Sequence, residues 1–121
     1  MPFPKDVLHL LEDTREVLIE TGSGEDATRT VIWVAIHDET VYLRSVRGES
    51  GLWYQRAMAD PEVTLIVGEF RIEGRAVPAD DPSSVEAASR GFQRKYPKSE
   101  SLESMLRPEV LGTTLRFEPR S

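Results

Sequence analysis

The segment VRGESGLWYQ concentrates residue types that bind anions in many proteins. Arg47 can donate charge-assisted hydrogen bonds to a phosphate, and Gly48 and Gly51 would let the backbone approach a ligand closely. A helix beginning just after the second glycine would add free backbone N–H groups, which also attract phosphate. The alternative is a capped turn, in which Ser50 caps the helix, the glycines form the turn and the arginine is solvated. These residues alone favour the capped turn, and both interpretations stay open.

Both tryptophans and three polar residues near this segment are further candidates. Trp53 would lie in the first turn of the helix, beside the basic loop, where a core role is harder to assign. Trp33 lies within a strongly apolar segment, which is typical of a core or interface anchor. Arg29 and Thr30 precede it and either face a ligand or form a polar start to the strand. Arg44, just before the loop, could add a second guanidinium for a phosphate.

Metal and acid–base chemistry find little support in the sequence. The chain has no cysteine, and its two histidines, His9 and His37, are far apart and match no ligand motif, so neither a metal site nor a histidine-based triad is predicted. His37 next to Asp38 is typical of a turn. The carboxylates are plentiful, but none lies in the apolar surroundings that suit a general acid or base. No catalytic residue is therefore predicted.

The overall charge argues against nucleic acid and membrane partners. Fifteen Lys and Arg residues against 21 Asp and Glu residues give a net charge of −6, which disfavours binding to nucleic acid and to anionic lipid surfaces. The charge is uneven, because residues 42–56 hold three arginines and one glutamate. No apolar run is long enough to span a bilayer, and the N-terminal segment lacks the pattern of a signal peptide. We expect a cytoplasmic protein.

The hydrophobic pattern predicts a mainly β protein. Six antiparallel strands are expected, mostly joined as hairpins, in segments 15–21, 28–37, 41–46, 62–68, 69–79 and 111–119. Two or three short helices accompany them, among them one at 5–13 and one that begins at Asp81-Pro82. A closed or partly open barrel satisfies this order without long exposed sheet edges. We expect one domain over residues 1–121, with the barrel over about 15–118.

The segment TRTVIWVAIH, residues 28–37, carries the strongest strand signal. Both of its faces are apolar, whereas a half-solvated antiparallel strand has one polar face. One face would line the barrel interior, and a helix or another subunit must cover the other. A homodimer is one simple way to cover it.

Five motifs together carry a family resemblance: TG at Thr21-Gly22, TRTVIW, VYLRSVRG, WYQRAMADPEV and RPEVLGTTLRFEP. In these motifs and in the order of its elements, the chain resembles the split β-barrel superfamily of pyridoxamine-phosphate-oxidase-like (PNPOx-like) flavoproteins and deazaflavin-dependent nitroreductases. Within that superfamily it is similar to the small uncharacterised DUF2255-type proteins. The resemblance runs from about Val17 to Phe117. It implies a homodimer with FMN or a deazaflavin at the subunit interface.

The resemblance also implies a set of cofactor-binding residues. One part lies beside the ring of the cofactor, at the centre of the doubly apolar strand and at the end of the next strand. Another part lies near the ribityl and phosphate portion, in the glycine-bearing loop and the helix after it, and the rest at the start of the apolar strand. The full set is Arg29, Thr30, Ile32, Trp33, Ser45, Val46, Arg47, Gly48 and Trp53.

The sequence departs from the nitroreductase pattern at one place. Those relatives carry a basic pair just after the Thr-Gly, where it binds phosphate, whereas this chain has Ser23-Gly24 followed by Glu25 and Asp26. Arg29 or Arg47 would have to replace that pair. Two functions are therefore implied: a flavin- or deazaflavin-dependent oxidoreductase, or a non-catalytic dimeric module of the same fold, with or without a bound cofactor.

Overall fold

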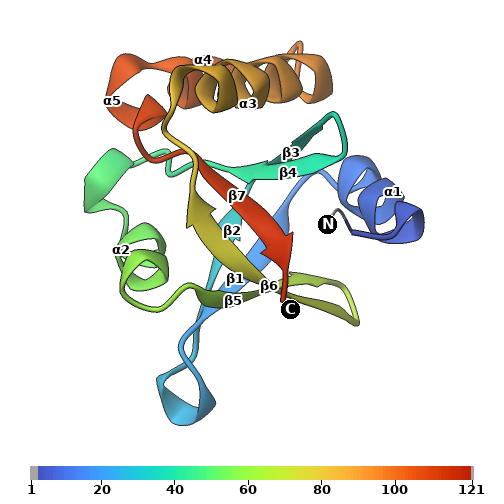
Figure 1. Ribbon diagram of the computed structural model, residues 1–121, viewed down its shortest axis with the longest axis vertical. Coiled ribbons are helices and arrows are strands. Elements are labelled where there is room, and N and C mark those ends of the chain that lie inside the picture. The colour runs from blue at the N-terminus through green and yellow to red at the C-terminus, as the bar shows by residue number, and fades with distance from the viewer. Residues whose placement is uncertain (1–2, 121) are drawn as a thin grey trace.

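The computed structural model describes residues 3–120, which form a curled antiparallel sheet flanked by short helices (Figure 1). Two 3-10 turns, η1 (Gly24–Asp26) and η2 (Gly48–Ser50), interrupt the chain. The helices and strands follow in the order α1 (Lys5–Asp13), β1 (Val17–Thr21), β2 (Thr28–Ile32), β3 (Val34–His37), β4 (Thr40–Leu43), α2 (Leu52–Ala59), β5 (Glu62–Val67), β6 (Phe70–Pro78), α3 (Pro82–Lys95), α4 (Leu102–Leu106), α5 (Pro108–Leu111) and β7 (Leu115–Pro119).

The sheet has seven strands in the order β2-β1-β5-β6-β7-β4-β3, not the six that the sequence predicts. The difference arises at Trp33, which divides the strand expected over 28–37 into β2 and β3. β2 pairs with β1, with Val17 opposite Ile32, whereas β3 pairs with β4, with Val34 opposite Leu43. One chain segment therefore forms both edges of the sheet, and its bend at Trp33 curls the sheet into a half-barrel.

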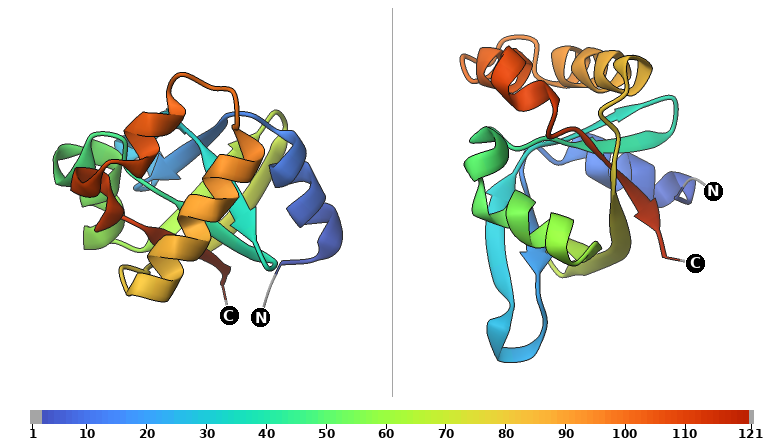
Figure 2. Two further views of the ribbon diagram at one scale, coloured as in Figure 1. Left: turned by 90° about the horizontal axis from the view of Figure 1, so that it is seen from above. Right: turned by 60° about the vertical axis from the view of Figure 1, so that its left-hand side comes forward.

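The two faces of β3 are buried in two separate cores. Val34 and Ile36 belong to the barrel interior, which α1 and α2 also enter with Leu11 and Trp53. Ala35 faces the other way and packs under α3. Figure 2 shows α3, α4 and α5 as a layer above β3 and β4. The covering that the doubly apolar strand requires is thus supplied by α3 for β3, while in β2 the side chain of Val31 stays 57% exposed.

Side chains of α3 satisfy the free edge of β3. Lys95 Nζ and Tyr96 Oη both donate hydrogen bonds to the Val34 carbonyl, at 2.8 and 3.2 Å, and Arg94 Nη2 donates to the Ile36 carbonyl at 2.6 Å. Burial lowers the pKa of Lys95 to about 8. These bonds hold α3 against the sheet and block the edge against another strand.

The helix signals of the sequence have mixed outcomes. Asp81 caps α3 as predicted, because its carboxylate accepts a hydrogen bond of 3.1 Å from the Ser84 N–H and Pro82 takes the first helical position. The structure has five α-helices within residues 3–120, however, which is more than the two or three predicted. The five-residue α4 lies where Leu102, Met105 and Leu106 predict a short helix, whereas the four-residue α5 is unexpected. The strand predicted over 111–119 begins only at Leu115, because Leu111 ends α5 and a turn follows.

Candidate functional site

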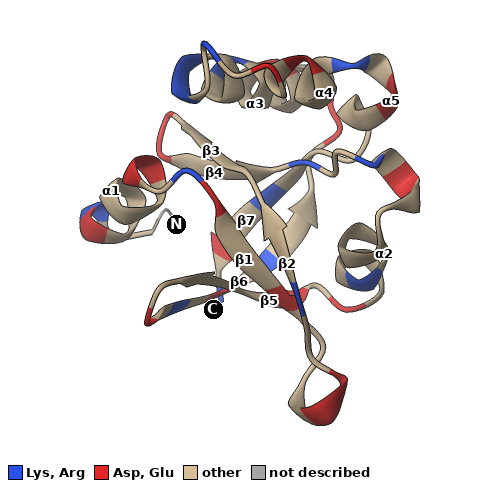
Figure 3. Ribbon diagram, turned by 180° about the vertical axis from the view of Figure 1, so that it is seen from behind, with Lys and Arg blue, Asp and Glu red and all other residues tan. Residues whose placement is uncertain are grey.

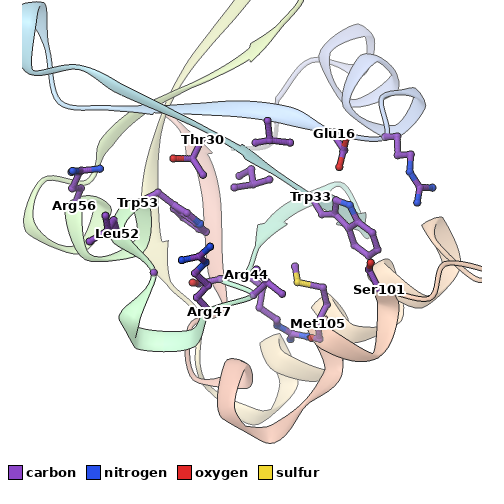
Figure 4. Close-up of a pocket in the computed structure, with 16 residues that line it drawn as sticks. Glu16, Thr30, Trp33, Arg44, Arg47, Leu52, Trp53, Arg56, Ser101 and Met105 are labelled. Atoms are coloured by element: carbon purple, nitrogen blue, oxygen red, sulfur yellow. The ribbon is translucent and has the colours of Figure 1, made fainter.

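A cavity of about 570 Å³ lies between the barrel and the α4 side of the helical layer, within the size range of small-molecule sites (Figure 4). Its walls come from the segment before β1, from β2 and Trp33, from the connection between β4 and α2, from α2 itself and from the α4 region. The lining residues are Arg15, Glu16, Thr30, Val31, Ile32, Trp33, Arg44, Ser45, Val46, Arg47, Gly51, Leu52, Trp53, Arg56, Ser101 and Met105.

The cavity is lined by every arginine that has no acidic partner within residues 3–120. Eight of the twelve arginines of the chain have a carboxylate oxygen within 4.0 Å. The other four have none within the described part of the chain, residues 3–120, and all four line the cavity: Arg15, Arg44, Arg47 and Arg56. Glu16 is the one acidic residue among the lining residues. In a protein of net charge −6, this arrangement gives the cavity a local excess of positive charge.

Arg44 is a buried cation beneath the cavity, and its role differs from the one the sequence indicates. The residue is 1% exposed, and its guanidinium donates to Thr114 Oγ1 at 2.9 Å, Ser89 Oγ at 3.0 Å, and the carbonyls of Met105 and Val85 at 2.8 and 3.1 Å. Burial lowers the pKa of Arg44 to about 10, so that it stays charged at neutral pH. Arg44 therefore holds the helical layer to the sheet rather than extending from the loop toward a phosphate.

Ser45 places an unpaired hydroxyl in the cavity wall. The residue is 1% exposed, and its Oγ is a buried side-chain polar atom with no hydrogen-bond partner among the residues described. Its backbone N–H donates to Thr113 Oγ1 at 3.0 Å, which fixes the position of the residue where the chain leaves β4. A buried polar group without a partner costs free energy, which makes this hydroxyl an exception among the buried polar side-chain atoms described.

The connection before α2 is not the capped turn that its residues favour. Ser50 does not cap the helix: its Oγ donates to the Arg47 carbonyl at 2.8 Å. Gly51 takes the N-cap position, without a side-chain hydrogen bond to the helix start. Gly51, Leu52 and Trp53 at the beginning of α2 line the cavity. The prediction of a Ser50 cap is therefore wrong, and the start of α2 keeps its backbone N–H groups free of a side-chain cap.

Seven of the nine residues predicted to bind a cofactor line this cavity: Thr30, Ile32, Trp33, Ser45, Val46, Arg47 and Trp53. The other two do not. Arg29 pairs instead with Glu20, its Nε lying 3.0 Å from the carboxylate. Gly48 is buried with a φ of +64°, and a Cβ there would lie 3.2 Å from the Glu109 carbonyl oxygen. Of the two arginines offered as a replacement for the missing basic pair, Arg47 is the one at the cavity.

The acidic turn at the missing basic pair lies away from the cavity. Ser23, Gly24, Glu25 and Asp26 are absent from its lining residues and form the tip of the β1–β2 hairpin. Figure 3 shows the acidic residues of this turn as a red stretch of ribbon at the far end of that hairpin. Within one chain, the carboxylates of the turn therefore make no direct contact with the cavity.

Four of the lining residues lie outside every segment in which the sequence placed candidate site residues: Arg15, Glu16, Ser101 and Met105. They come from segments remote from the predicted loop and reach the cavity through the packing of α4 and of the chain before β1. Arg56 could have been predicted from the sequence, because it lies three residues after Trp53 and four after Leu52, and therefore next to both on the surface of the helix. Its Nη1 donates to Thr28 Oγ1 at 3.1 Å, which holds α2 beside β2.

The curled antiparallel sheet, with one bent segment at both edges, defines a split β-barrel of the PNPOx-like class. Solved structures agree on this fold. A pyridoxamine 5′-phosphate oxidase-like protein from Listeria innocua is 18% identical, with a TM-score of 0.67 and coverage of 97% of this chain and 93% of that one. The chain itself belongs to the family described as uncharacterized protein conserved in bacteria (DUF2255), whose model matches residues 7–117. The predicted resemblance is thereby confirmed.

Two other solved structures show that proteins of this fold differ in what they bind. A FAD-binding protein from Mesorhizobium loti is 12% identical, with a TM-score of 0.67 and coverage of 97% and 87% of the two chains. The heme storage protein HutZ from Vibrio cholerae is 8% identical, with a TM-score of 0.66 and coverage of 100% and 92%. No curated protein matches the sequence. At these identities the likeness concerns the fold alone.

Two further properties bear on the kind of site. Within residues 3–120, no three His, Cys, Asp or Glu side chains gather in a way that could hold a metal ion. In the same part of the chain, no helix combines the length and the apolar character needed to cross a membrane.

Proposed function

We propose that the protein binds a flavin-type cofactor, FMN or a deazaflavin, in the cavity between Trp33 and Trp53. The observation that carries the proposal is the gathering of the four arginines without acidic partners around one cavity. A flavin joins a planar apolar ring to an anionic tail. In this cavity the tryptophans suit the ring, and the guanidinium groups suit the tail.

The residues of the cavity fit the two parts of such a cofactor. Trp53, Leu52 and Arg56 lie at one end of the view in Figure 4, with Arg47 toward that end. This end, with the start of α2, suits the phosphate. Ile32 and the unpaired Ser45 hydroxyl belong to the wall that suits the ring, because a hydroxyl can both donate to and accept from ring atoms.

The cofactor would supply hydride transfer, and the chain's own residues would bind it, orient it and exclude water. The reaction class supported by the site is therefore a flavin- or deazaflavin-dependent oxidation or reduction. No side chain is assigned a catalytic role. The cavity has no histidine among its lining residues, and its one carboxylate belongs to Glu16.

Heme is the less suitable occupant. Heme iron takes an axial ligand from His, Cys, Met or Tyr. Among the lining residues Met105 alone is of these types, and it is buried. His9 and His37 do not line the cavity. A flavin needs no such ligand.

A second candidate function is a non-catalytic module that binds a cofactor without turning over a substrate. The specific observation in its favour is the lack of a lining histidine or of a lining carboxylate other than Glu16. The two functions differ in one measurement. An oxidoreductase reoxidises its reduced cofactor faster when a substrate is added, whereas a carrier module does not.

A homodimer forms part of the proposal. Val31, Val46 and Leu52 line the cavity and are 57%, 46% and 62% exposed, so that they form an apolar rim around it. A second copy packed on this rim would bury these side chains and close the cavity to water. Light scattering during size-exclusion chromatography measures the mass directly, and a strict monomer at micromolar concentration would contradict this part.

The test is a titration of the purified protein with FMN and with the deazaflavin, followed by flavin fluorescence, for wild type and two variants. We expect Arg47→Gln to weaken FMN binding about tenfold, because it removes charge-assisted hydrogen bonds to the phosphate. Arg90→Gln is the matched control, since Arg90 pairs with Glu86 on α3 and does not line the cavity. Equal weakening in both variants would reject the assignment of Arg47.

A further inference from the structure

We infer that the Trp33 end of the cavity is a second anion subsite that takes an aromatic carboxylate, and that this is the substrate class of the protein. The inference rests on the proposed function, because a substrate needs a cofactor beside it. In Figure 4, Trp33, Glu16 and Ser101 lie at the end of the cavity opposite Trp53 and Arg56. The two ends thus present two separate sets of ligand groups.

The cation of this subsite is Arg15. No acidic side chain of residues 3–120 lies within 4.0 Å of its guanidinium, and its one hydrogen bond is a long one of 3.4 Å from Nη2 to Ser99 Oγ. The side chain is exposed. Arg15 is therefore a cation at the cavity wall whose guanidinium can turn toward a ligand.

The flat surface of this subsite is Trp33, held in place by Tyr96. The two rings stack with centroids 3.8 Å apart and planes within 8° of parallel. Tyr96 Oη is fixed by donation to the carbonyls of Arg15, at 2.6 Å, and Val34, at 3.2 Å. Tyr96 thus covers one face of the indole and fixes its orientation.

The guanidinium of Arg15 lies beside this stack and not on the face of Trp33. Its carbon is 5.7 Å from the Trp33 centroid and 5.6 Å from the Tyr96 centroid. The two rings are parallel and 3.8 Å apart, so an atom equally distant from both centroids lies midway between their planes. Such an atom is at the edge of the stack and not above an outer face. Neither residue therefore covers the Trp33 face away from Tyr96, and Trp33 is among the residues that line the cavity.

These groups select a ligand of defined chemistry. An aromatic ring stacked on Trp33 would bring a carboxylate to the edge of the stack, where Arg15 lies, and the guanidinium fork matches a carboxylate in shape. A doubly charged phosphate is better served by the other end, which has Arg47 and Arg56, whereas this end has one arginine and Glu16. Ser101, whose side chain makes no capping bond to α4, adds a hydroxyl.

The experiment measures binding of three probes by calorimetry and by tryptophan fluorescence: benzoate, its neutral analogue benzyl alcohol, and acetate. We expect benzoate to bind more tightly than both analogues, since it alone has ring and charge. Arg15→Gln and Trp33→Leu should each weaken benzoate binding about tenfold. Arg47→Gln, at the other end, should leave benzoate affinity unchanged within twofold, and Glu16→Gln should increase it several-fold.

Contrary results would overturn the subsite. They are benzyl alcohol binding as tightly as benzoate, or Arg47→Gln weakening benzoate as much as Arg15→Gln does. Because Arg15 is exposed, its variant should keep the melting temperature of wild type, which excludes unfolding as a cause. The FMN and benzoate titrations test the two proposals separately. Binding of benzoate without binding of FMN would reject the cofactor and keep the subsite. Binding of FMN without binding of benzoate would reject the subsite.

Discussion

Ser45 Oγ lies where a side chain on Gly51 would begin, because a Cβ built on Gly51 overlaps this hydroxyl. The φ of Gly51 is −64°, so the position requires glycine for space and not for backbone conformation. The first turn of α2 can therefore approach the end of β4 closely, and the unpaired hydroxyl lies between them. This contact shapes the cavity wall beneath the proposed ring of the cofactor.

We predict that Gly51→Ala weakens FMN binding at least tenfold, because the added methyl group must displace Ser45 or the start of α2. Flavin fluorescence titration measures the affinity, and thermal melting measures the accompanying loss of stability. Gly112→Ala is the matched control, since a Cβ at Gly112 meets no atom within 4 Å. Equal affinities of Gly51→Ala and wild type would show that the contact does not shape the site.

Arg44→Gln should destabilise the protein by about 3 kcal/mol or more, since it leaves buried acceptors without donors. Those acceptors include the Met105 and Val85 carbonyls and Thr114 Oγ1. Urea unfolding measures the free energy of unfolding. The exposed substitution Arg90→Gln should change it by no more than about 0.5 kcal/mol. A similarly small effect at Arg44 would mean that its network does not hold the helical layer.

Lys95 should make stability depend on pH in the alkaline range. Its pKa in the folded protein is about 8, below the ordinary value of 10.5, because burial disfavours the charged form. The unfolded chain therefore keeps the proton longer, and the contribution of Lys95 to stability rises between about pH 8 and 10.5. Below pH 8 the full cost of the buried charge is present.

Urea unfolding of wild type and Lys95→Met across this pH range measures that contribution as a difference. As the pH rises, we expect the free energy of unfolding of wild type to increase relative to that of Lys95→Met, by at most about 3 kcal/mol. A difference that is flat from pH 7 to 10.5 would contradict the lowered pKa of this amine.

Leu52→Asp should weaken the proposed homodimer at least tenfold, because it places a charge in the apolar rim of the cavity. Met58→Asp is the matched control: Met58 lies on the same helix, is also exposed, and does not line the cavity. Light scattering over a dilution series measures the dissociation constant. Identical dissociation curves for the two variants would place the interface elsewhere.

The sequence predicts much of this fold, and its errors have physical causes. The mainly β composition, the helix at 5–13 and the Asp81 cap depend on local patterns, and the structure confirms them. The division of one strand at Trp33 depends on closure of the sheet, and no local propensity marks it. The same holds for Arg44, which looked like a loop cation until the packing of α3 and α4 enclosed it.

The residues of the candidate site were also predicted only in part. Residues 45–47, 51–53 and 30–33 line one cavity because the end of β4 and the end of β2 are neighbours in the half-barrel, and the family resemblance pointed to both segments. Arg15 and Ser101 reach the cavity through tertiary packing across long stretches of chain. No spacing rule connects them, so of the residues argued to form that end of the cavity the sequence indicated only Trp33.

The most direct test of the central claim is calorimetric titration of the wild-type protein with FMN and with riboflavin, which lacks the phosphate. If the arginines without acidic partners form a site for a phosphate-bearing flavin, FMN binds with micromolar or better affinity and at least tenfold more tightly than riboflavin. Raising the salt concentration should reduce that difference. Absence of binding by both compounds, or equal affinity for the two, would contradict the account.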